Sequence, residues 1–131
     1  MKKPKIGEIW LVTIPELFYE QDESINIKIQ TRPFLVLDDG RGLIVEADYR
    51  NYHCFKLTSQ YDKYKRKPIK NWKEKGLLKK SYIRIEMPLK IEEKQFKRKI
   101  SELNTLEMIE VYKELYKIIN VKTLEKISET V

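Results

Sequence analysis

The sequence predicts a mostly β domain of the α+β class: a small barrel of about six short antiparallel strands, followed by a C-terminal helix. Short apolar or alternating runs, separated by turn-forming residues, fill most of the chain. Helical spacing of apolar residues begins only after residue 104. Eight Tyr, four Phe and two Trp favour a β-rich core over a helical bundle. With 131 residues, the chain is expected to form one domain over residues 1–131.

The N-terminal part predicts two strand regions with an acidic loop between them. Residues 5–14 carry apolar side chains on both faces and form the first strand, which Pro15 is expected to end. Residues 16–24 are acidic and lack strand patterning, so they are predicted to form an exposed loop. Isoleucines alternate with polar residues over 25–30, as in a half-buried strand. This strand leads into the apolar strand at 31–37.

The middle of the chain predicts further short strands. The Asp-Gly sequence within 38–42 is a hairpin signal, so a strand over 43–45 is expected to return beside the preceding one. The apolar run at 52–57 is the next strand. Residues 81–87 alternate clearly, and Pro88 is expected to break that strand, with residues 89–91 as a short continuation or edge.

Helical turns are predicted later in the chain. Residues 71–76 are expected to form one turn, with Asn71 as its N-cap and Gly76 as its left-handed end. Residues 92–102 are charged and predict a second short helical turn. The first turn is expected to be anchored on the barrel by three apolar residues: Trp72, Leu77 and Leu78.

The C-terminal helix is predicted to begin at a capping box. Asn104 can accept from free backbone N–H groups, and Glu107 can reach back to the Asn104 N–H. Residues 120–131 either extend this helix or fray. One face of the helix is apolar: Met108, Val111, Tyr112, Leu115, Ile118 and Ile119.

Composition limits the function classes. The chain carries 27 Lys and Arg against 20 Asp and Glu, a formal charge of +7. Such a charge attracts polyanions, although it also serves solubility alone. No apolar stretch approaches the ~20 residues of a membrane span, and no signal core follows the basic N-terminus. A single cysteine, Cys54, suits a reducing cytoplasm, and one His with one Cys excludes the usual zinc constellations.

Two polar clusters are candidates for chemistry. Arg32 stands with Pro33 at the start of an apolar strand, and its planar guanidinium matches phosphate oxygens. Thr58, Ser59 and Gln60 end another strand. Alternatively, Arg32 is an ordinary surface residue and Thr58 a capping hydroxyl.

A basic and aromatic segment follows the second cluster. Bases could stack on its tyrosines while its cations contact phosphates, as in sequence-tolerant binding of single strands. Alternatively, the segment is a solvated basic loop. The candidate RNA-binding residues are Gln60, just before this segment, and within it Tyr61, Tyr64, Lys65, Arg66 and Lys67.

Four motifs, in order, resemble those of the MazF/PemK-like toxins of type II toxin–antitoxin systems. They are Gly7-Glu8-Ile9-Trp10, then Thr31-Arg32-Pro33-Phe34-Leu35-Val36-Leu37, then Leu57-Thr58-Ser59-Gln60, and finally the Asn71–Leu77 and Ser81–Arg84 stretches with Lys99–Leu103. The resemblance covers residues 5 to about 119.

The resemblance implies an SH3-like barrel with a C-terminal helix and a cytoplasmic homodimer. It also implies a metal-independent endoribonuclease without cofactors, which cleaves single-stranded RNA and binds a cognate antitoxin. The family's functional residues match Arg32 and Thr58, with Ser59 as a second hydroxyl candidate. The alternative is a non-catalytic binding module on the same barrel, either similar to gyrase poisons or an inactive RNA-binding relative.

Cleavage by the RNA 2′-hydroxyl needs a base, charge stabilisation at phosphorus and a proton for the leaving oxygen. Arg32 suits charge stabilisation. The base has no clear holder, and the sequence offers Glu20 and His53 as candidates. Glu20 is otherwise a solvated loop carboxylate that contacts RNA. His53 is otherwise a partly buried structural histidine, and Cys54 is expected to lie in the core.

Overall fold

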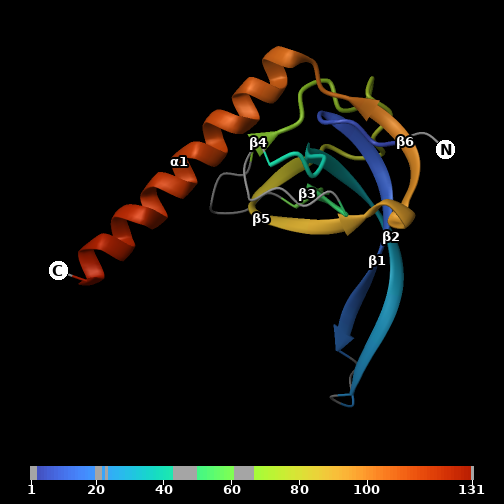
Figure 1. Ribbon diagram of the computed structural model, residues 1–131. Helices are drawn as coiled ribbons and strands as arrows, with labels where there is room; N and C mark the ends of the chain where they lie inside the picture. The colour runs from blue at the N-terminus through green and yellow to red at the C-terminus, as the bar shows by residue number, and fades with distance from the viewer. Residues whose placement is uncertain (1–2, 20–21, 23, 43–49, 61–66, 131) are drawn as a thin grey trace.

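The computed structural model describes residues 3–19, 22, 24–42, 50–60 and 67–130. Its elements are β1 (Glu8–Tyr19), β2 (Ile25–Asp38), β3 (Asn51–Thr58), β4 (Lys67–Pro68), β5 (Tyr82–Glu92), a 3₁₀ turn (Glu93–Gln95), β6 (Phe96–Glu102) and α1 (Thr105–Thr130). The strands form one antiparallel sheet in the order β4-β5-β3-β2-β1-β6. The sheet curls into a half-barrel, and the first half of α1 crosses over it (Figure 1). The predicted mostly β barrel with a C-terminal helix is confirmed.

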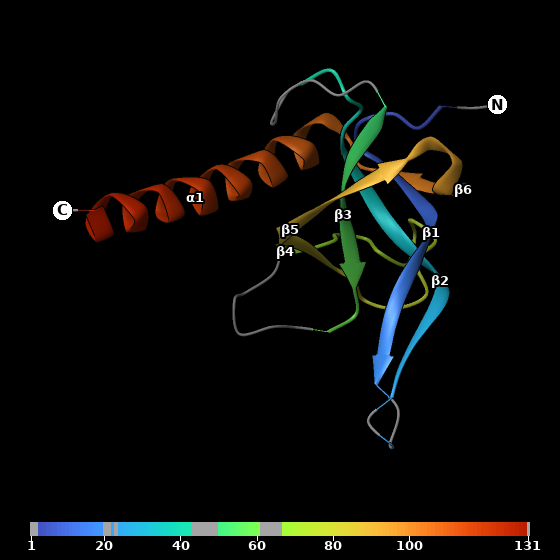
Figure 2. The ribbon, with the colours of Figure 1, turned by 60° about the horizontal axis from the view of Figure 1, so that its bottom comes forward.

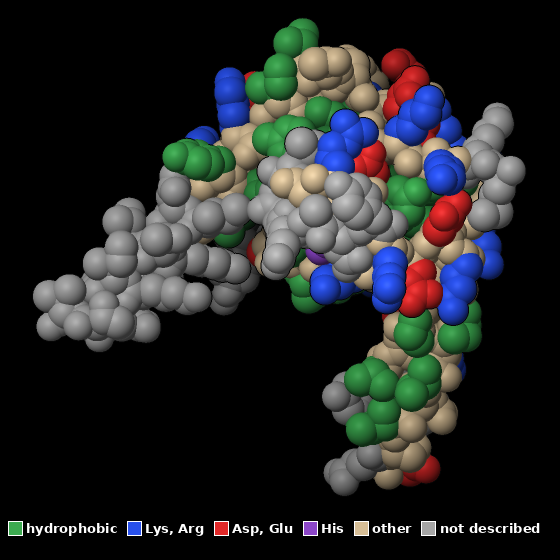
Figure 3. All heavy atoms as spheres, viewed as in Figure 1, with side chains coloured by type: hydrophobic (Ala, Val, Ile, Leu, Met, Phe, Trp, Pro, Cys, Tyr) green, Lys and Arg blue, Asp and Glu red, His purple; other side chains and the backbone are tan. Residues whose placement is uncertain are grey.

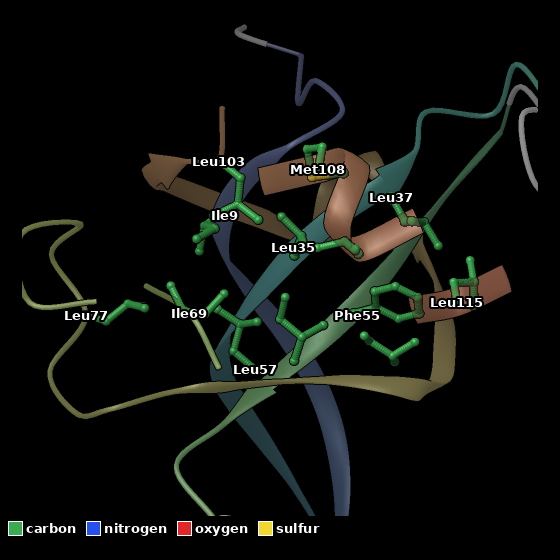
Figure 4. Close-up of a cluster of buried hydrophobic side chains, with 13 residues drawn as sticks. Ile9, Leu35, Leu37, Phe55, Leu57, Ile69, Leu77, Leu103, Met108 and Leu115 are labelled. Atoms are coloured by element: carbon green, nitrogen blue, oxygen red, sulfur yellow. The ribbon is translucent and has the colours of Figure 1, made fainter. Parts of the chain in front are cut away.

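The main core lies between one face of the curled sheet and the start of α1 (Figure 4). Because side chains alternate along a strand, Leu35 and Leu37 of β2 point to this face, together with Phe55 of β3. From α1, Val111 reaches the same core and is fully buried. The Tyr112 hydroxyl also donates to the Leu37 carbonyl at 2.9 Å, which holds the helix on β2.

A second cluster covers the opposite face of the sheet. Trp10, Phe34 and Cys54 are buried there, and Phe96 packs against them. The Phe96 ring meets Trp10 edge-on, with 5.9 Å between the ring centroids. Side chains on both faces of the sheet are therefore buried, which explains why the first strand and the strand at 31–37 are apolar on both faces.

The buried carboxylate of Glu8 joins β1 to β6. Its Oε1 accepts from the Lys5 N–H at 2.7 Å and from the Trp10 Nε1 at 3.0 Å. Its Oε2 lies 2.9 Å from the Lys99 ammonium. The acidic residue of the first motif thus has a structural role.

The capping box predicted for α1 is confirmed. The Glu107 N–H donates to the Asn104 Oδ1 at 2.8 Å, and the Asn104 N–H donates to the Glu107 Oε1 at 3.0 Å. The predicted apolar face is buried at Met108, Val111 and Leu115 and packs against the core at Tyr112 and Ile118.

The prediction that Pro15 ends the first strand is wrong. β1 continues to Tyr19, and Pro15 pairs with Ile29 of β2. β6 pairs with β1 only as far as Val12, so at Pro15 the second edge of β1 carries no strand among the described residues. A proline without an N–H is tolerated at such an edge. Residues 16–19 are therefore strand and not loop.

Two further strand predictions also need correction. β5 continues through Pro88, which pairs with Phe55 beside a register shift where the regular ladder is interrupted. Residues 92–102 contain the expected short helical turn, but Phe96–Glu102 form β6. The run of cations in β6 hides its strand pattern, because three consecutive residues are polar and exposed: Lys97, Arg98 and Lys99.

The predicted single turn at 71–76 forms, since the Lys75 N–H donates to the Asn71 carbonyl at 3.1 Å, but Asn71 is not an N-cap residue. Asn71 has a φ of 54°, whereas an N-cap residue has extended geometry. Gly76 does adopt the left-handed conformation, with a φ of 81°. Trp72 and Leu77 contact the core as expected, but Leu78 is 96% exposed and anchors nothing.

The predicted strand at 43–45 lies outside the described residues. Over the part of the chain that is described, no helix is both long and apolar enough to cross a membrane.

Candidate functional site

Four residues, one on each of β2, β3, β5 and β4, form a row on one face of the sheet: Arg32, Thr58, Tyr82 and Pro68. The β2–β3 register ends at the pair of Phe34 with Lys56. Arg32 and Thr58 each lie two residues beyond that pair, so both project to the same face. Thr58 pairs with Tyr82 of β5, and Tyr82 pairs with Pro68 of β4. Residues that are level on neighbouring strands project to the same face. The fold therefore places two clusters that the sequence keeps 26 positions apart on the same face of neighbouring strands.

A carboxylate completes the cluster around Arg32. The Oε1 of Glu16 lies 3.0 Å from the Nζ of Lys56 and 3.4 Å from the Nε of Arg32. The side chains of Glu16 and Lys56 are 18% and 23% exposed, and that of Arg32 is 42% exposed. Lys28 pairs with Glu16 in the β1–β2 register and adds a third cation on this face. Two cations thus contact one carboxylate and a third lies on the same face, so this surface suits an anionic ligand.

The cations keep Glu16 ionised. Partial burial would raise the pKa of Glu16, but the hydrogen bond and charge of Lys56, followed by those of Arg32, outweigh it. The pKa of Glu16 therefore lies below its usual value. Only the Nε of Arg32 takes part in the contact with Glu16, so its terminal nitrogens are not used there.

The Thr58 hydroxyl caps the end of β3, as the alternative to a catalytic role predicts. Its Oγ1 accepts from the Gln60 N–H at 3.2 Å and so closes the turn after β3. The hydroxyl proton remains able to donate to an incoming oxygen. Ser59 and Gln60 are both exposed just beyond the strand end.

Tyr82 is the aromatic residue of the row. It is half-buried and neighbours Thr58. The Nζ of Lys80 lies 5.9 Å from the centre of its ring. Arg84 follows on the same face of β5, because it lies two residues further along the strand. This part of the row joins an aromatic surface to cations.

The structure does not bring His53 to Arg32. On β3, His53 shares a face with Phe55 and Leu57 of the main core, whereas Lys56 and Thr58 point to the other face. His53 is 8% exposed, and its Nδ1 has no hydrogen-bond partner among the residues that the structure describes. Cys54 is buried as expected, and burial raises the pKa of its thiol.

The remaining predicted RNA-binding residues divide into two groups. Lys67 pairs with Ile83 and so lies on the face opposite to Tyr82, in a small groove beside Glu107, Glu110 and Val111 of α1. The others lie outside the described residues: Glu20, Tyr61, Tyr64, Lys65 and Arg66.

Sequence reasoning missed Glu16, Lys28, Lys56 and Tyr82. The spacing of Glu16 was a usable signal. If the strand continues past Pro15, Glu16 lies on the same face as Trp10, Val12 and Ile14, which precede it at steps of two. Lys56 stands two residues before Thr58, so both must share a face. For Tyr82 no local signal existed, because its place depends on which strand pairs with β3.

We expect Glu16→Gln to lower the free energy of unfolding at pH 7 by about 1 kcal/mol, because it removes a partly buried ion pair. The pKa of Glu16 is lowered in the folded state, so its contribution is present above the unfolded-state pKa and is lost as pH falls through the folded-state pKa. Urea unfolding from pH 7 down to pH 3 should therefore show the two proteins converging in acid. Glu110→Gln, in an exposed pair with Lys113, should match wild type throughout.

No family model matches the chain, and a search of curated proteins finds no match. The resemblance of the four motifs to the MazF/PemK-like toxins therefore stays a prediction. Among the described residues, no group of three or more His, Cys, Asp or Glu side chains gathers as metal ligands would.

Proposed function

We propose that this protein is a cytoplasmic toxin endoribonuclease that cleaves single-stranded RNA by metal-independent transesterification. The observation that carries this proposal is the row from Arg32 through Thr58 to Tyr82, with Glu16 and Lys56 at its end. It supplies a phosphate-binding cation, a hydroxyl donor, an aromatic surface for a base and an acid–base pair on one face. By resemblance, the partners are a second copy and a cognate antitoxin.

The proposed reaction divides three tasks among these side chains. The RNA 2′-oxygen attacks the adjacent phosphorus, and its proton passes to the Glu16 carboxylate. Arg32 and the Thr58 hydroxyl stabilise the charge on the phosphoryl oxygens.

As the bond from phosphorus to the 5′-oxygen breaks, that oxygen takes a proton from the Lys56 ammonium. The products are a 2′,3′-cyclic phosphate and a 5′-hydroxyl end. Proton transfer from Glu16 to Lys56 across their 3.0 Å contact restores both groups.

The test is incubation of the purified protein with a long single-stranded RNA in the presence of EDTA, followed by mapping of the ends. We expect internal cuts that leave a cyclic phosphate and a 5′-hydroxyl. Intact RNA, or fragments with 5′-phosphates, would contradict the proposal.

A second candidate function is binding of single-stranded nucleic acid without cleavage. The lowered pKa of Glu16 favours it, because an acidic carboxyl group is a weak base. RNA that is bound at the row but stays intact would identify this function.

We expect Tyr82→Ala to weaken binding of single-stranded nucleic acid about 10- to 100-fold, because a base loses its stacking surface. Tyr82→Phe keeps the ring and should bind as wild type does. Fluorescence anisotropy with single-stranded DNA, which lacks the attacking 2′-hydroxyl, measures affinity without cleavage. Tyr116→Ala, on an exposed part of α1, is the matched control. Equal affinities for Tyr82→Ala and Tyr116→Ala would remove Tyr82 from the site.

A further inference from the structure

Three consecutive exposed residues lie beside the aromatic part of the row: Leu78, Lys79 and Lys80, which we call the basic tip. The Nζ of Lys80 is 5.9 Å from the centre of the Tyr82 ring. Lys79 precedes Lys80 in the chain and is also exposed. A base that stacks on Tyr82 would therefore bring an adjoining phosphate within reach of the basic tip.

The basic tip is anchored on both sides. Before it, Leu77 is buried in the main core, and its N–H donates to the Trp72 carbonyl at 3.1 Å. After it, Ser81 is buried, and its Oγ donates to the Lys79 carbonyl at 2.8 Å. The Ser81 carbonyl accepts from the Ile69 N–H at 2.9 Å. The backbone of the tip is therefore fixed before a ligand arrives, which lowers the entropic cost of binding.

The lysines of the basic tip have no partner of opposite charge in the part of the chain that the structure describes. Neither Lys79 nor Lys80 forms an ion pair there. Lys56, by contrast, contacts Glu16 at 3.0 Å, and this contact offsets part of its charge. By sequence, residues 70–80 hold five lysines and one carboxylate, a net +4. An anion that reaches the basic tip thus meets cations that do not have to give up a partner.

The Arg32 end of the row adjoins a two-stranded arm, which the outer ends of β1 and β2 form within residues 13–31 (Figures 1 and 2). β6 pairs with β1 only as far as Val12, and β3 pairs with β2 only from Phe34 onward. Among the described residues, the strands of the arm therefore pair only with each other. By sequence, residues 13–31 hold four carboxylates and one lysine, a net −3. This net charge repels phosphates.

One face of the arm is apolar and exposed (Figure 3). Leu17 is 61% exposed, and Ile27, which pairs with it, is 69% exposed. Ile25 and Ile29 share this face and are 57% and 67% exposed, so the half-buried state expected for these isoleucines is wrong. Aliphatic side chains offer a phosphate neither charge nor a hydrogen bond. The arm therefore gives a polyanion no favourable continuation, whereas the basic tip does.

We propose that the single strand bound at the row continues past Tyr82 onto the basic tip, where Lys80 and Lys79 bind the phosphates of the nucleotides that follow. The inference rests on the proposed binding of single-stranded RNA at the row. It adds a direction, because the strand extends beyond Tyr82 and not along the arm. Phosphate contacts do not read base edges, so this extension adds affinity for any sequence.

Fluorescence anisotropy with single-stranded DNA over a range of salt concentrations tests the proposal, since DNA is bound without being cleaved. The double variant Lys79→Gln/Lys80→Gln should reduce the slope of log K against log salt by about 1.4, or about 0.7 for each lost phosphate contact. At about 0.1 M salt, its binding should be roughly 10- to 30-fold weaker than that of wild type. Lys113→Gln/Lys117→Gln removes the same charge from an exposed part of α1 and should keep the slope close to that of wild type.

The length of the DNA gives a second measurement. An oligothymidylate of about four nucleotides covers little beyond the row, whereas one of about ten also reaches the basic tip. Wild type should bind the longer strand more tightly, and Lys79→Gln/Lys80→Gln should lose most of this gain. Tyr82→Ala should weaken binding of both lengths.

Two results would overturn the inference while leaving binding at the row intact. One is an equal salt slope for the two double variants, and the other is an unchanged gain with length in Lys79→Gln/Lys80→Gln. A wild-type protein that binds no single-stranded DNA or RNA would instead overturn the proposed function, and the inference with it.

Discussion

Arg32→Ala is expected to reduce the cleavage rate of single-stranded RNA by about 10²- to 10³-fold, the usual effect of removing one donor to a developing oxyanion. The reason is its place in the row: Arg32 shares a face with Thr58 of the neighbouring strand and is the most exposed member of the cluster with Glu16 and Lys56. Arg32→Lys keeps the charge but loses the planar fork, so it should recover only part of the rate. Rates come from single-turnover cleavage with saturating protein.

Arg41→Ala is the matched control for this experiment. Arg41 is also an arginine paired with a carboxylate, but its partner is Asp39 in the exposed turn after β2. Its cleavage rate should equal that of wild type. If Arg32→Ala cleaves as fast as Arg41→Ala, the row is not the catalytic site.

Phe55→Ala is expected to lower the free energy of unfolding by about 3–5 kcal/mol, as large-to-small changes of buried aromatic residues do. Phe55 is 0% exposed and lies between the sheet and α1 (Figure 4). Against a total of about 5–15 kcal/mol for domains of this kind, the loss leaves a marginal protein.

Urea titration at pH 7 measures this change, with Leu78→Ala as its control. Leu78 is also a large apolar residue but is 96% exposed, so its removal should change stability by less than about 0.5 kcal/mol. A similar small change for Phe55→Ala would mean that the helix does not cover this part of the sheet in solution.

Local patterns predicted much of the fold. The alternation in Tyr82–Met87 assigned the buried and outward faces of β5, and the Asn104–Glu107 pair located the start of α1. Both depend on residues a few positions apart. The strands through Pro15 and Pro88 were mispredicted, because tolerance of a proline depends on which strand lies at its edge, and that is a property of the whole sheet.

The site was predictable only in part, for the same reason. Arg32 and Thr58 could be named from their own chemistry and from the resemblance. Glu16 could not, since its approach to Lys56 follows from a strand that continues past a proline and from the order of three strands. Glu16 therefore becomes a candidate for the base only once the strands are placed.

The outer ends of β1 and β2 (residues 13–31) form a two-stranded arm, which affects the cluster of Glu16, Arg32 and Lys56. Glu16 lies on the arm, whereas Lys56 lies on β3 in the body, so their 3.0 Å contact spans the joint between the two. The ion pair thus ties the outer ends of β1 and β2 to the neighbouring strand β3. A partner that binds the outer part of the arm would thus be coupled, through this ion pair of Glu16, to the phosphate-binding residues beside it.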